Sequence, residues 1–396
     1  MNILVVSHAC ATPVNQQFFA TVERLSGWSL SLVAPARWLD DYGTERSLTR
    51  WPSFSGSLHP IPVWGNGSVP LHVYRSLFRS LLQEERPDAI YVHHEPYAAA
   101  TAQMYLANRL WHGCPIGFFT WQNLNKSYPP PFRYTEQMVY RQSAFACAGS
   151  ESAVSVLRQK GYTGPTLLLP GHVDPAVHHP IPAAELRTEL GIPADAVILG
   201  FMGRLSPAKG LTTLMEALSS IRGLPWHLVL VGEGTFADTL RETAAQHGLS
   251  DRLHFTGYVP HTEAPRYLSL FDVLVLPSET QSNWKEQFGR VLIEALACGT
   301  PLVGSTSGEI PFVIERTGGG LTFPEGNASA LGEVLRQMIG DPKIRDQFAK
   351  TGRAHVLEEY TDQVLARKFI DTLQHTCGLP SAASHRSLSP SAAPSP

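Results

Sequence analysis

Short apolar runs alternate with helix-length segments through the first 170 residues, and this alternation limits the possible folds more than any other feature. Each run has the length of a buried strand, and the segments between them are long enough for helices. Strands that are apolar throughout and joined by helical crossovers predict a parallel sheet covered on both faces. The six runs comprise residues 3–6, 30–33, 89–92, 116–120, 145–148 and 166–169.

The second half of the chain repeats the pattern after a proline-rich segment, residues 173–192, that lacks apolar periodicity and is typical of an interdomain linker. We therefore predict one domain over residues 1–172 and a second over 193–360. Strands are expected at residues 197–202, 227–231, 252–259, 272–277 and 301–303, and helices at 328–339, 343–360 and 362–374. The Pro, Ser and Ala content of residues 378–396 predicts a disordered tail.

Residues 276–304 predict a strand, a loop, a helix and a further strand, and this stretch carries the strongest functional signal. The loop carries Glu286, and the helix begins near Gly289 and carries Glu294. In an open parallel sheet such a loop leaves the edge where ligands bind, and the helix start favours an anion. Phosphates would repel the two carboxylates, so we expect these to accept hydroxyl groups of a sugar or ribose. The combination indicates a nucleotide-sugar site.

The segment EQFGRVLIEALACGTPLV, with seven residues between Glu286 and Glu294, resembles the signature of the retaining glycosyltransferases of family 4. The resemblance implies the GT-B fold: two facing Rossmann-like α/β domains, a cleft between them, and a C-terminal helix, here residues 361–376, that crosses back to the first domain. It also implies a hexosyltransferase-like enzyme of polysaccharide, glycolipid or other glycoconjugate biosynthesis. Such an enzyme moves a sugar from a nucleoside diphosphate sugar to an acceptor hydroxyl and retains the anomeric configuration.

Two cations follow a predicted strand in the segment GRLSPAKG, which resembles another family 4 motif. Arg204 can bind phosphate oxygens through two N–H groups, and Lys209 can bind them as a compact charge. The resemblance implies that Arg204, Lys209 and Glu286 are catalytic. It places the turns around Gly232 and Tyr258 beside the nucleotide base. The complete set expected to bind the donor is Gly203, Phe288, Gly289, Arg290, Val291, Glu294, Gly232, Tyr258 and Val259.

The loops of the first domain are expected to face the acceptor. The segment HHEP resembles the acceptor-side loop of family 4, and we give His94 and Glu95 equal weight as cleft residues and as structural residues. Many family members have a histidine in this region, where this chain has Trp121, Gln122 and Asn123, and the two amides could bind a sugar. The first turn, which carries His8, has no glycine-rich fingerprint, so dinucleotide binding is not expected.

Residues 69–83 place five apolar side chains on one helical face. We expect a helix packed on its own sheet, and the alternative is a helix lying on a membrane surface. The five are Leu71, Tyr74, Phe78, Leu81 and Leu82.

The sequence predicts neither a metal site nor a cofactor besides the donor. No convincing Asp-x-Asp motif is present, and His172, His178 and His179 lack metal-ligand spacing. The adjacent His93 and His94 should point in opposite directions on a strand, which disfavours a shared metal.

Charge and cysteine content exclude some classes of protein. Residues 1–170 carry 13 basic and 10 acidic side chains, a net charge of +3, and the rest carries 18 and 24, a net charge of −6. This asymmetry is too weak for nucleic-acid binding but compatible with contact to an anionic membrane. The chain has no apolar run of membrane-spanning length and no basic leader. Its five scattered cysteines are expected to be buried thiols in a reducing cytoplasm.

Three other functions remain open at this point. A nucleotide-sugar epimerase or a sugar phosphorylase could share the fold, and a non-catalytic subunit could retain only the donor pocket. The four charged residues Arg204, Lys209, Glu286 and Glu294 argue against a binding subunit. The missing histidine at Trp121 keeps it open.

Overall fold

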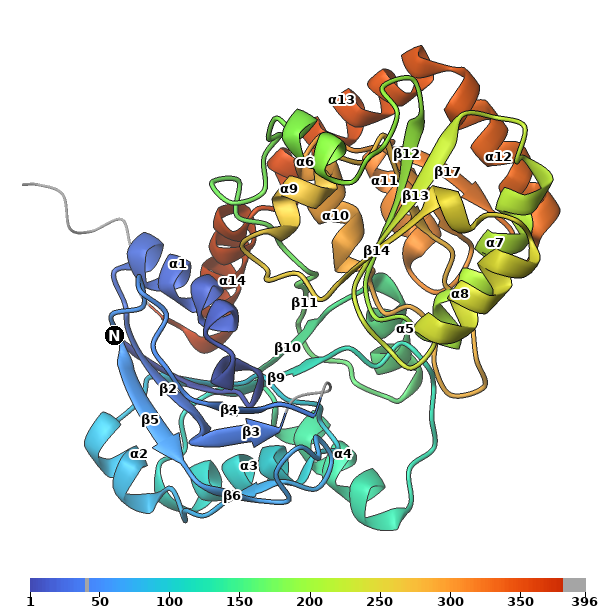
Figure 1. The fold of residues 1–396 in the computed structure, drawn as a ribbon. Coiled ribbons are helices and arrows are strands. Elements are labelled where there is room, and N and C mark those ends of the chain that lie inside the picture. Colours follow the sequence, from blue (N-terminus) through green and yellow to red (C-terminus); the bar gives the residue numbers. More distant parts are fainter. Residues whose placement is uncertain (40–42, 380–396) are drawn as a thin grey trace, which may run out of the picture.

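A computed structural model of the 396-residue chain describes residues 1–39 and 43–379. Two parallel sheets, each covered by helices, form two facing Rossmann-like domains (Figure 1). The GT-B fold expected from the sequence is therefore confirmed. The predicted tail falls on residues 380–396, which lie outside the described residues, apart from its first two positions.

The first sheet has seven parallel strands in the order β11-β10-β9-β8-β1-β2-β5. All six runs predicted from the sequence are strands in this sheet. The seventh, β5, was missed because its side chains are only partly buried and Pro60 interrupts it; a proline is tolerated on such an edge strand. The bounds are β1 Asn2–Val6, β2 Ser29–Pro35, β5 Ser57–Ile61, β8 Ala89–Val92, β9 Ile116–Thr120, β10 Phe145–Ala148 and β11 Thr166–Leu168.

Helices cover both faces of this sheet. Helices α1 and α14 lie on one face, and α2, α3 and α4 lie on the other (Figure 1). Two short antiparallel pairs, β3 with β4 and β6 with β7, extend from the sheet. The helices are α1 Gln17–Ser26, α2 Arg79–Glu85, α3 Ala99–Trp111, α4 Pro130–Gln142 and α5 Glu151–Gln159, and the short strands are β3 Arg37–Leu39, β4 Glu45–Ser47, β6 Val63–Trp64 and β7 Val73–Tyr74.

The single helix expected over residues 69–83 is wrong, since only Arg79–Glu85 is helical there. Tyr74 belongs instead to β7 and pairs with Val63. Phe78 has φ 61°, a left-handed conformation that a helix cannot run through. Leu71 is 60% exposed on a turn, so the five apolar side chains do not form one face. The pairing of β7 with β6 thus prevented the helix that the local periodicity predicted. The alternative of a membrane-surface helix over these residues is wrong for the same reason.

The second sheet has six parallel strands in the order β14-β13-β12-β15-β16-β17. Chain order reverses between β12 and β15, and ligands bind at such a switch point in open α/β sheets. The loops that follow β12 and β15 both lie at this switch point, so residues 203–210 lie beside residues 277–289. The strands are β12 Val197–Met202, β13 Trp226–Val231, β14 Leu253–Gly257, β15 Val273–Leu276, β16 Leu302–Ser305 and β17 Gly320–Phe323.

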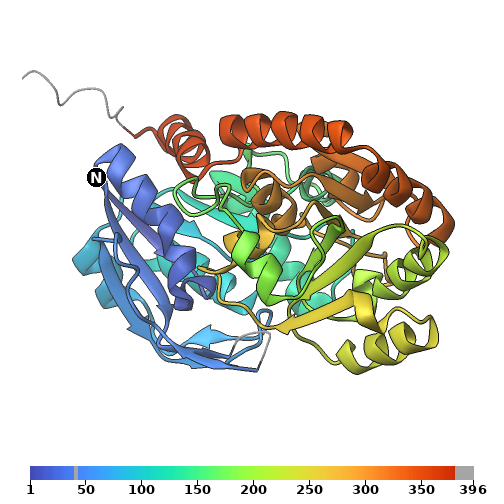
Figure 2. The same ribbon diagram turned by 45° about the horizontal axis from the view of Figure 1, so that its top comes forward.

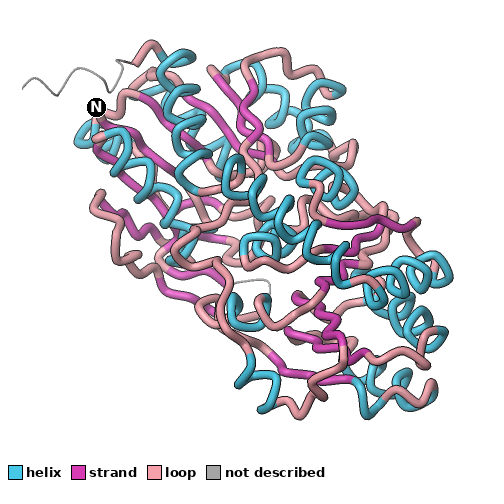
Figure 3. The backbone as a smooth tube through the Cα atoms, turned by 90° about the horizontal axis from the view of Figure 1, so that it is seen from above, coloured by secondary structure: helices cyan, strands magenta, loops and turns pink. Residues whose placement is uncertain are grey.

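Helices surround the second sheet as they do the first, and the tube in Figure 3 shows each group of strands flanked by helices. None of the described helices is long and apolar enough to cross a membrane. The bounds are α6 Ala184–Glu189, α7 Leu211–Ser220, α8 Ala237–Gln246, α9 Ala264–Leu268, α10 Arg290–Ala297, α11 Ile310–Thr317, α12 Ala328–Gly340 and α13 Pro342–Glu359.

The C-terminal helix α14, Asp362–Cys377, returns to the first domain and packs against α1 (Figures 1 and 2). Its Leu365, Phe369 and Leu373 are buried in the core of that domain. The Thr21 hydroxyl of α1 donates a hydrogen bond of 2.7 Å to Asp362. The crossing helix implied by the family resemblance is therefore present.

All five cysteines are unpaired thiols. Cys10, Cys147 and Cys298 are buried, as expected. Cys114 and Cys377 are partly exposed, so the expectation of five buried thiols is wrong for these two.

Candidate active site between the two domains

The start of helix α10 points into a cavity of about 590 Å³ at the switch point of the second sheet. Gly289 precedes the helix with φ 73°, a conformation that glycine adopts without strain. The first N–H groups of a helix have no partner within it and attract anions. Predicted donor residues line this cavity: Gly203, Arg204, Lys209, Glu286, Gly289, Arg290, Val291 and Glu294.

Gly210 allows the two site loops to touch. It has φ 65°, and a Cβ atom there would lie 1.8 Å from the carbonyl oxygen of Pro277. The backbone N–H of Glu279 donates to the carbonyl of Ala208 at 2.9 Å, which joins the loops directly. A short 3₁₀ turn, Pro207–Lys209, then directs Lys209 toward the loop after β15.

Lys209 and Glu286 form an ion pair, although the sequence suggested separate tasks for them. The Lys209 Nζ donates to Oε2 of Glu286 at 2.6 Å, and the Ser278 hydroxyl donates to the same oxygen at 2.8 Å. Glu286 is only 7% exposed. Nζ also lies 5.0 Å from the ring centre of Trp284, a cation–π contact. An ammonium group has three donors, so this pairing leaves Lys209 able to bind a phosphate as well.

Glu294 lies in the second turn of α10 and is also buried. It forms an ion pair with Arg290, whose Nε lies 3.0 Å from Oε1 of Glu294. His178 and His261 face it, and the potential ligand atoms of the three lie within 4.8 Å of one another. Burial lowers the pKa of both histidines, and the Glu294 carboxylate opposes that shift.

These two histidines were missed as neighbours of Glu294. His178 was considered only for metal-ligand spacing, and His261 not at all, because they come from the linker and from the loop after β14. The absence of metal-ligand spacing in the sequence therefore does not exclude ligands that meet in three dimensions.

A second cavity of about 370 Å³ continues from the first and reaches the first domain. The two cavities share Glu286, Gly289, Arg290 and Glu294. The wall from the first domain is largely aromatic, while the linker and second domain supply polar groups. The cleft thus has a charged end and an aromatic end. The aromatic wall is formed by Phe18, Phe19, Tyr91, His93, Phe119 and Trp121, with Phe288 opposite.

Trp121 belongs to the aromatic wall of this cavity. Its ring packs 5.2 Å from Phe119 and 6.4 Å from Phe288, between centres. It also covers Gly149, where a Cβ atom would lie 2.0 Å from the indole. His93 and His172 line the same cavity, and burial lowers their pKa values to about 4 and about 3. Both imidazoles are therefore neutral at pH 7, and their place in this cavity was not predicted from the sequence.

The acceptor-side residues separate into two groups. Glu95, Gln122 and Asn123 line a small cavity of about 90 Å³ between the domains. Asn123 Nδ2 donates to the backbone carbonyl of Glu286 at 2.9 Å. This amide therefore contacts the loop that carries Glu286. His94 is 1% exposed and lines none of these three cavities, which favours the structural one of its two expected roles. It packs against other histidines instead.

Glu95 accepts hydrogen bonds from the Thr120 hydroxyl at 2.6 Å and from the Trp121 N–H at 2.8 Å. Burial raises the pKa of its carboxyl to about 7, although both hydrogen bonds act in the opposite direction. Glu95 therefore positions the aromatic wall through the backbone of Trp121.

The three residues expected near the base lie at the ends of β13 and β14. Gly232, Tyr258 and Val259 line none of the three cavities. Gly232 nevertheless adjoins the first cavity, because a Cβ atom on it would lie 2.0 Å from the carbonyl oxygen of Gly203. Tyr258 is 58% exposed. Contact between these residues and a base stays a prediction.

Hydrogen bonds across the cleft hold the domains together. The Glu309 carboxylate accepts from the N–H of Glu151 at 2.9 Å and from the hydroxyl of Ser152 at 2.7 Å, at the start of α5. Lys126 Nζ donates to the carbonyl of Asn283 at 2.7 Å. The structure therefore represents a closed arrangement of the two domains.

Residues 183–355 match the family model for glycosyl transferases group 1. This range of the chain is therefore similar to the group 1 glycosyl transferases. It contains every charged residue that lines the 590 Å³ cavity. The matched range thus supplies the charged end of the cleft.

Curated proteins with similar sequences include named glycosyltransferases. The lipopolysaccharide core biosynthesis glycosyltransferase LpsE of Rhizobium meliloti is 31% identical over 47% of this chain and 52% of its own. The 2-deoxystreptamine N-acetyl-D-glucosaminyltransferase of Streptomyces fradiae is 28% identical over 71% of this chain and 70% of its own. The chain spans about half the length of most of the curated relatives it matches.

Solved structures agree with the fold of this chain. Sucrose-phosphate synthase from Thermosynechococcus elongatus has a TM-score of 0.75 at 20% identity, covering 95% of this chain and 98% of that one. HepE of Anabaena in complex with UDP has a TM-score of 0.75 at 18% identity, covering 95% and 100%. At these identities the similarity establishes the fold alone.

Proposed function

We propose that the protein is a glycosyltransferase that moves a sugar from a nucleoside diphosphate sugar to an acceptor hydroxyl, in glycoconjugate biosynthesis. The observation that carries the proposal is the charged cavity at the start of α10. It combines two cations, Arg204 and Lys209, with two buried carboxylates, Glu286 and Glu294. The named functions of its glycosyltransferase relatives support the class of reaction.

The diphosphate would lie between the start of α10 and the two cations. Charge grows on the diphosphate as the sugar leaves, and donors fixed in advance stabilise that charge. Lys209 would keep its bond to Glu286 and use its other N–H groups for a phosphate oxygen. In this proposal protein groups balance the leaving charge, so added Mg²⁺ should leave kcat unchanged.

The carboxylates would orient the donor. Glu294 would accept hydroxyl groups of the ribose, and Glu286 those of the transferred sugar. Lys209 and Ser278 both donate to Oε2 of Glu286, so its second oxygen can accept from a sugar hydroxyl. The anomeric carbon would then face the aromatic end of the cleft, where the acceptor enters. Fixing both reactants in this way lowers the entropic part of the barrier.

Retention of the anomeric configuration is part of the proposal. The acceptor would attack on the face from which the diphosphate leaves, and a phosphate oxygen would take its proton. Neutral His93 and His172 line the cleft but need not act as bases in this scheme. Proton NMR of the first product would show the anomeric configuration, and an inverted product would reject retention.

The test is a screen of UDP-, GDP- and ADP-sugars by thermal shift and by release of nucleoside diphosphate. Lys209→Ala and Glu294→Gln remove one charge each from the cavity, and Lys350→Ala is the matched control on the exposed face of α13. We expect one donor to raise Tm, and we expect both site variants, but not the control, to abolish the shift. A donor that binds all variants equally would place the site elsewhere.

The same assay separates the alternatives. Conversion of the nucleotide sugar to an isomer, without diphosphate release and without acceptor, would identify an epimerase. Donor binding without turnover across a panel of glycan and lipid-linked acceptors would favour a binding subunit.

A further inference from the structure

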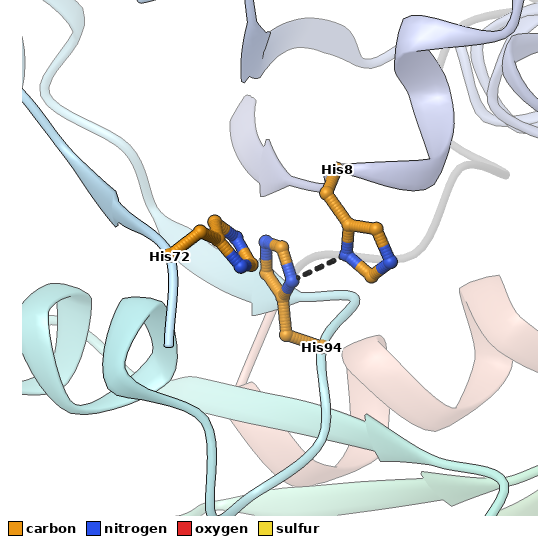
Figure 4. Close-up of side chains that lie close together, drawn as sticks. All are labelled: His8, His72 and His94. Atoms are coloured by element: carbon orange, nitrogen blue, oxygen red, sulfur yellow. Dashed lines mark hydrogen bonds between the residues drawn. The ribbon is translucent and has the colours of Figure 1, made fainter. Parts of the chain in front are cut away.

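Three histidines from distant parts of the chain meet at the edge of the first sheet, outside the cavities described above. His8 follows β1, His94 follows β8, and His72 precedes β7. Strands β1 and β8 are neighbours, so the residues that follow them leave the sheet side by side. Figure 4 shows the three rings converging, and their potential ligand atoms all lie within 4.8 Å of one another.

One ring nitrogen of His72 is buried without a hydrogen-bond partner in the part of the chain that the structure describes. Its side chain is fully buried, and Nδ1 lies 3.0 Å from the carbonyl of Ser68 and 3.1 Å from that of Val69. Carbonyls only accept, so Nδ1 carries the hydrogen and Nε2 carries a lone pair. Nε2 is buried and has no hydrogen-bond partner among the described residues. A buried acceptor without a partner is costly, and a bound cation would remove that cost.

His94 and His8 face each other through Nδ1 atoms 2.7 Å apart (Figure 4). On its other side, His94 Nε2 lies 3.3 Å from the Tyr74 hydroxyl. Histidines that bind metals usually donate their second ring N–H to a carbonyl, carboxylate or water. His72 has backbone carbonyls in that place, and His94 has a buried hydroxyl.

The three rings are electrically suited to a cation. Burial lowers the pKa of His8 to about 3, and it lowers those of His72 and His94 below the ordinary value. Each ring is therefore neutral at pH 7, which is the form that binds metals. One divalent ion can use the lone pairs of all three neutral rings at once.

We propose that His8, His72 and His94 bind a structural Zn²⁺ ion. Zinc accepts imidazole nitrogens at about 2.0–2.1 Å in tetrahedral geometry, which places ligand nitrogens about 3.4 Å apart. Reaching that spacing from the observed one requires ring movements on the order of 1 Å. His8 is only partly buried, so an ion can enter from its side, and a water would complete four ligands.

The ion would join three loops that border the cleft. Ala9, which follows His8, lines the 370 Å³ cavity, and Glu95, which follows His94, lines the 90 Å³ cavity. Zinc would therefore fix the wall of the first domain and raise its stability. It would take no part in transfer at the charged end of the cleft, so this inference is independent of the proposed function.

The first test uses the full wild-type chain, stripped with a chelator and then titrated with Zn²⁺ or Co²⁺. We expect one ion per chain, a Tm that rises with Zn²⁺ concentration, and visible Co²⁺ absorption of tetrahedral intensity. X-ray absorption at the zinc edge should count three imidazole ligands. Two imidazoles and one carboxylate would place the ion at His178, His261 and Glu294 instead and overturn the proposal, as would an absence of zinc uptake.

Variants then identify the ligands. His8→Asn and His94→Gln should each weaken zinc affinity by more than about 100-fold, because losing a ligand costs more than the 10- to 100-fold typical of losing a ligand's hydrogen-bond partner. Tyr74→Phe removes only such a partner and should weaken affinity about tenfold.

The matched control is His254→Asn, which breaks another hydrogen-bonded histidine pair, 3.0 Å from His227, in the second domain. It should leave zinc affinity unchanged. Equal affinity in the control and in His8→Asn would reject the assignment. Circular dichroism of each variant separates loss of zinc from loss of fold, and the wild-type absorption data decide the question if a variant does not fold.

Discussion

At the scale of single residues, the pairing of Lys209 with Glu286 is the contact that most affects how the site can work. The charges of the two side chains neutralise each other away from solvent, and the Ser278 hydroxyl donates to the same carboxylate. Removing one partner of a buried pair leaves an uncompensated charge. The two residues should therefore act as one unit in binding the donor and in stabilising the leaving diphosphate.

A double-mutant cycle tests this coupling. Lys209→Ala should lower kcat/KM by about 100-fold or more, as expected for losing a group that stabilises leaving charge. Glu286→Gln should lower it as well, and the double variant should lose less than the product of the two single effects. Steady-state kinetics with the donor found in the screen give these values. Independent effects that multiply would contradict a shared role, and Lys350→Ala should match the wild type.

Glu95 predicts a pH dependence of stability. The folded protein holds the pKa of this carboxyl at about 7, above the unfolded value of about 4.5, so the folded state binds the proton more tightly. This contribution is fully present below pH 4.5 and is lost as pH rises through 7. Glu95→Gln keeps one oxygen that can accept from the Trp121 N–H, and its NH2 group can donate to the Thr120 hydroxyl, but it cannot ionise. Its free energy of unfolding, relative to the wild type, should rise between pH 4.5 and 7 by about 2 kcal/mol.

Denaturant unfolding at several pH values measures that difference. A relative stability that does not change with pH would show that Glu95 is ionised without penalty. Glu315→Gln, on the exposed side of α11, should show no such trend.

At the scale of elements, one glycine allows the loop before α11 to contact the loop that carries Glu286. Gly308 has φ 57°, and a Cβ atom on it would lie 2.0 Å from the carbonyl oxygen of Glu286. The N–H of Glu309 donates to the same carbonyl at 3.2 Å. The backbone of Glu286 is therefore held between this loop and Asn123 of the first domain.

Replacing Gly308 should displace the loop that carries Glu286. Gly308→Ala adds a steric clash to the cost of a left-handed alanine, and we expect a loss of about 3 kcal/mol or more together with a large fall in kcat. Gly326→Ala is the matched control, since Gly326 has φ 71° and nothing lies within 4 Å of its Cβ position. It should lose only about 1 kcal/mol and keep its activity. Thermal unfolding and kinetics compare the two, and equal losses would show that the close approach to Glu286 is unimportant.

At the scale of the whole molecule, a single carboxylate links the two domains at the start of α5. Glu309 is 2% exposed and accepts from the first N–H groups of that helix, where the helix dipole favours negative charge. The bond forms only while the domains are closed. Closure excludes water from the cleft and so limits hydrolysis of the donor.

Glu309→Ala should shift the molecule toward an open arrangement. A hydrogen bond to a charged group contributes about 1.5–3 kcal/mol, which corresponds to a shift of about 10- to 100-fold in the closing equilibrium. Small-angle X-ray scattering should show a larger radius of gyration than in the wild type, and transfer should slow relative to hydrolysis. Glu315→Ala removes a carboxylate from the same helix and should change neither. A variant as compact as the wild type would assign closure to other contacts, such as that of Lys126 with Asn283.

The sequence by itself determined most strands of the two sheets and the charged residues around α10, because apolar periodicity and loop chemistry are local properties of a chain, and the family resemblance implied the crossing helix. Local periodicity failed at residues 69–83, where β7 pairs with β6 and Phe78 adopts a left-handed conformation. Only the tertiary structure decided which distant side chains meet. The fold brings Lys209 to Glu286, His178 and His261 to Glu294, and His8, His72 and His94 to one point. Those encounters depend on strand order and domain closure, which no spacing along the sequence encodes.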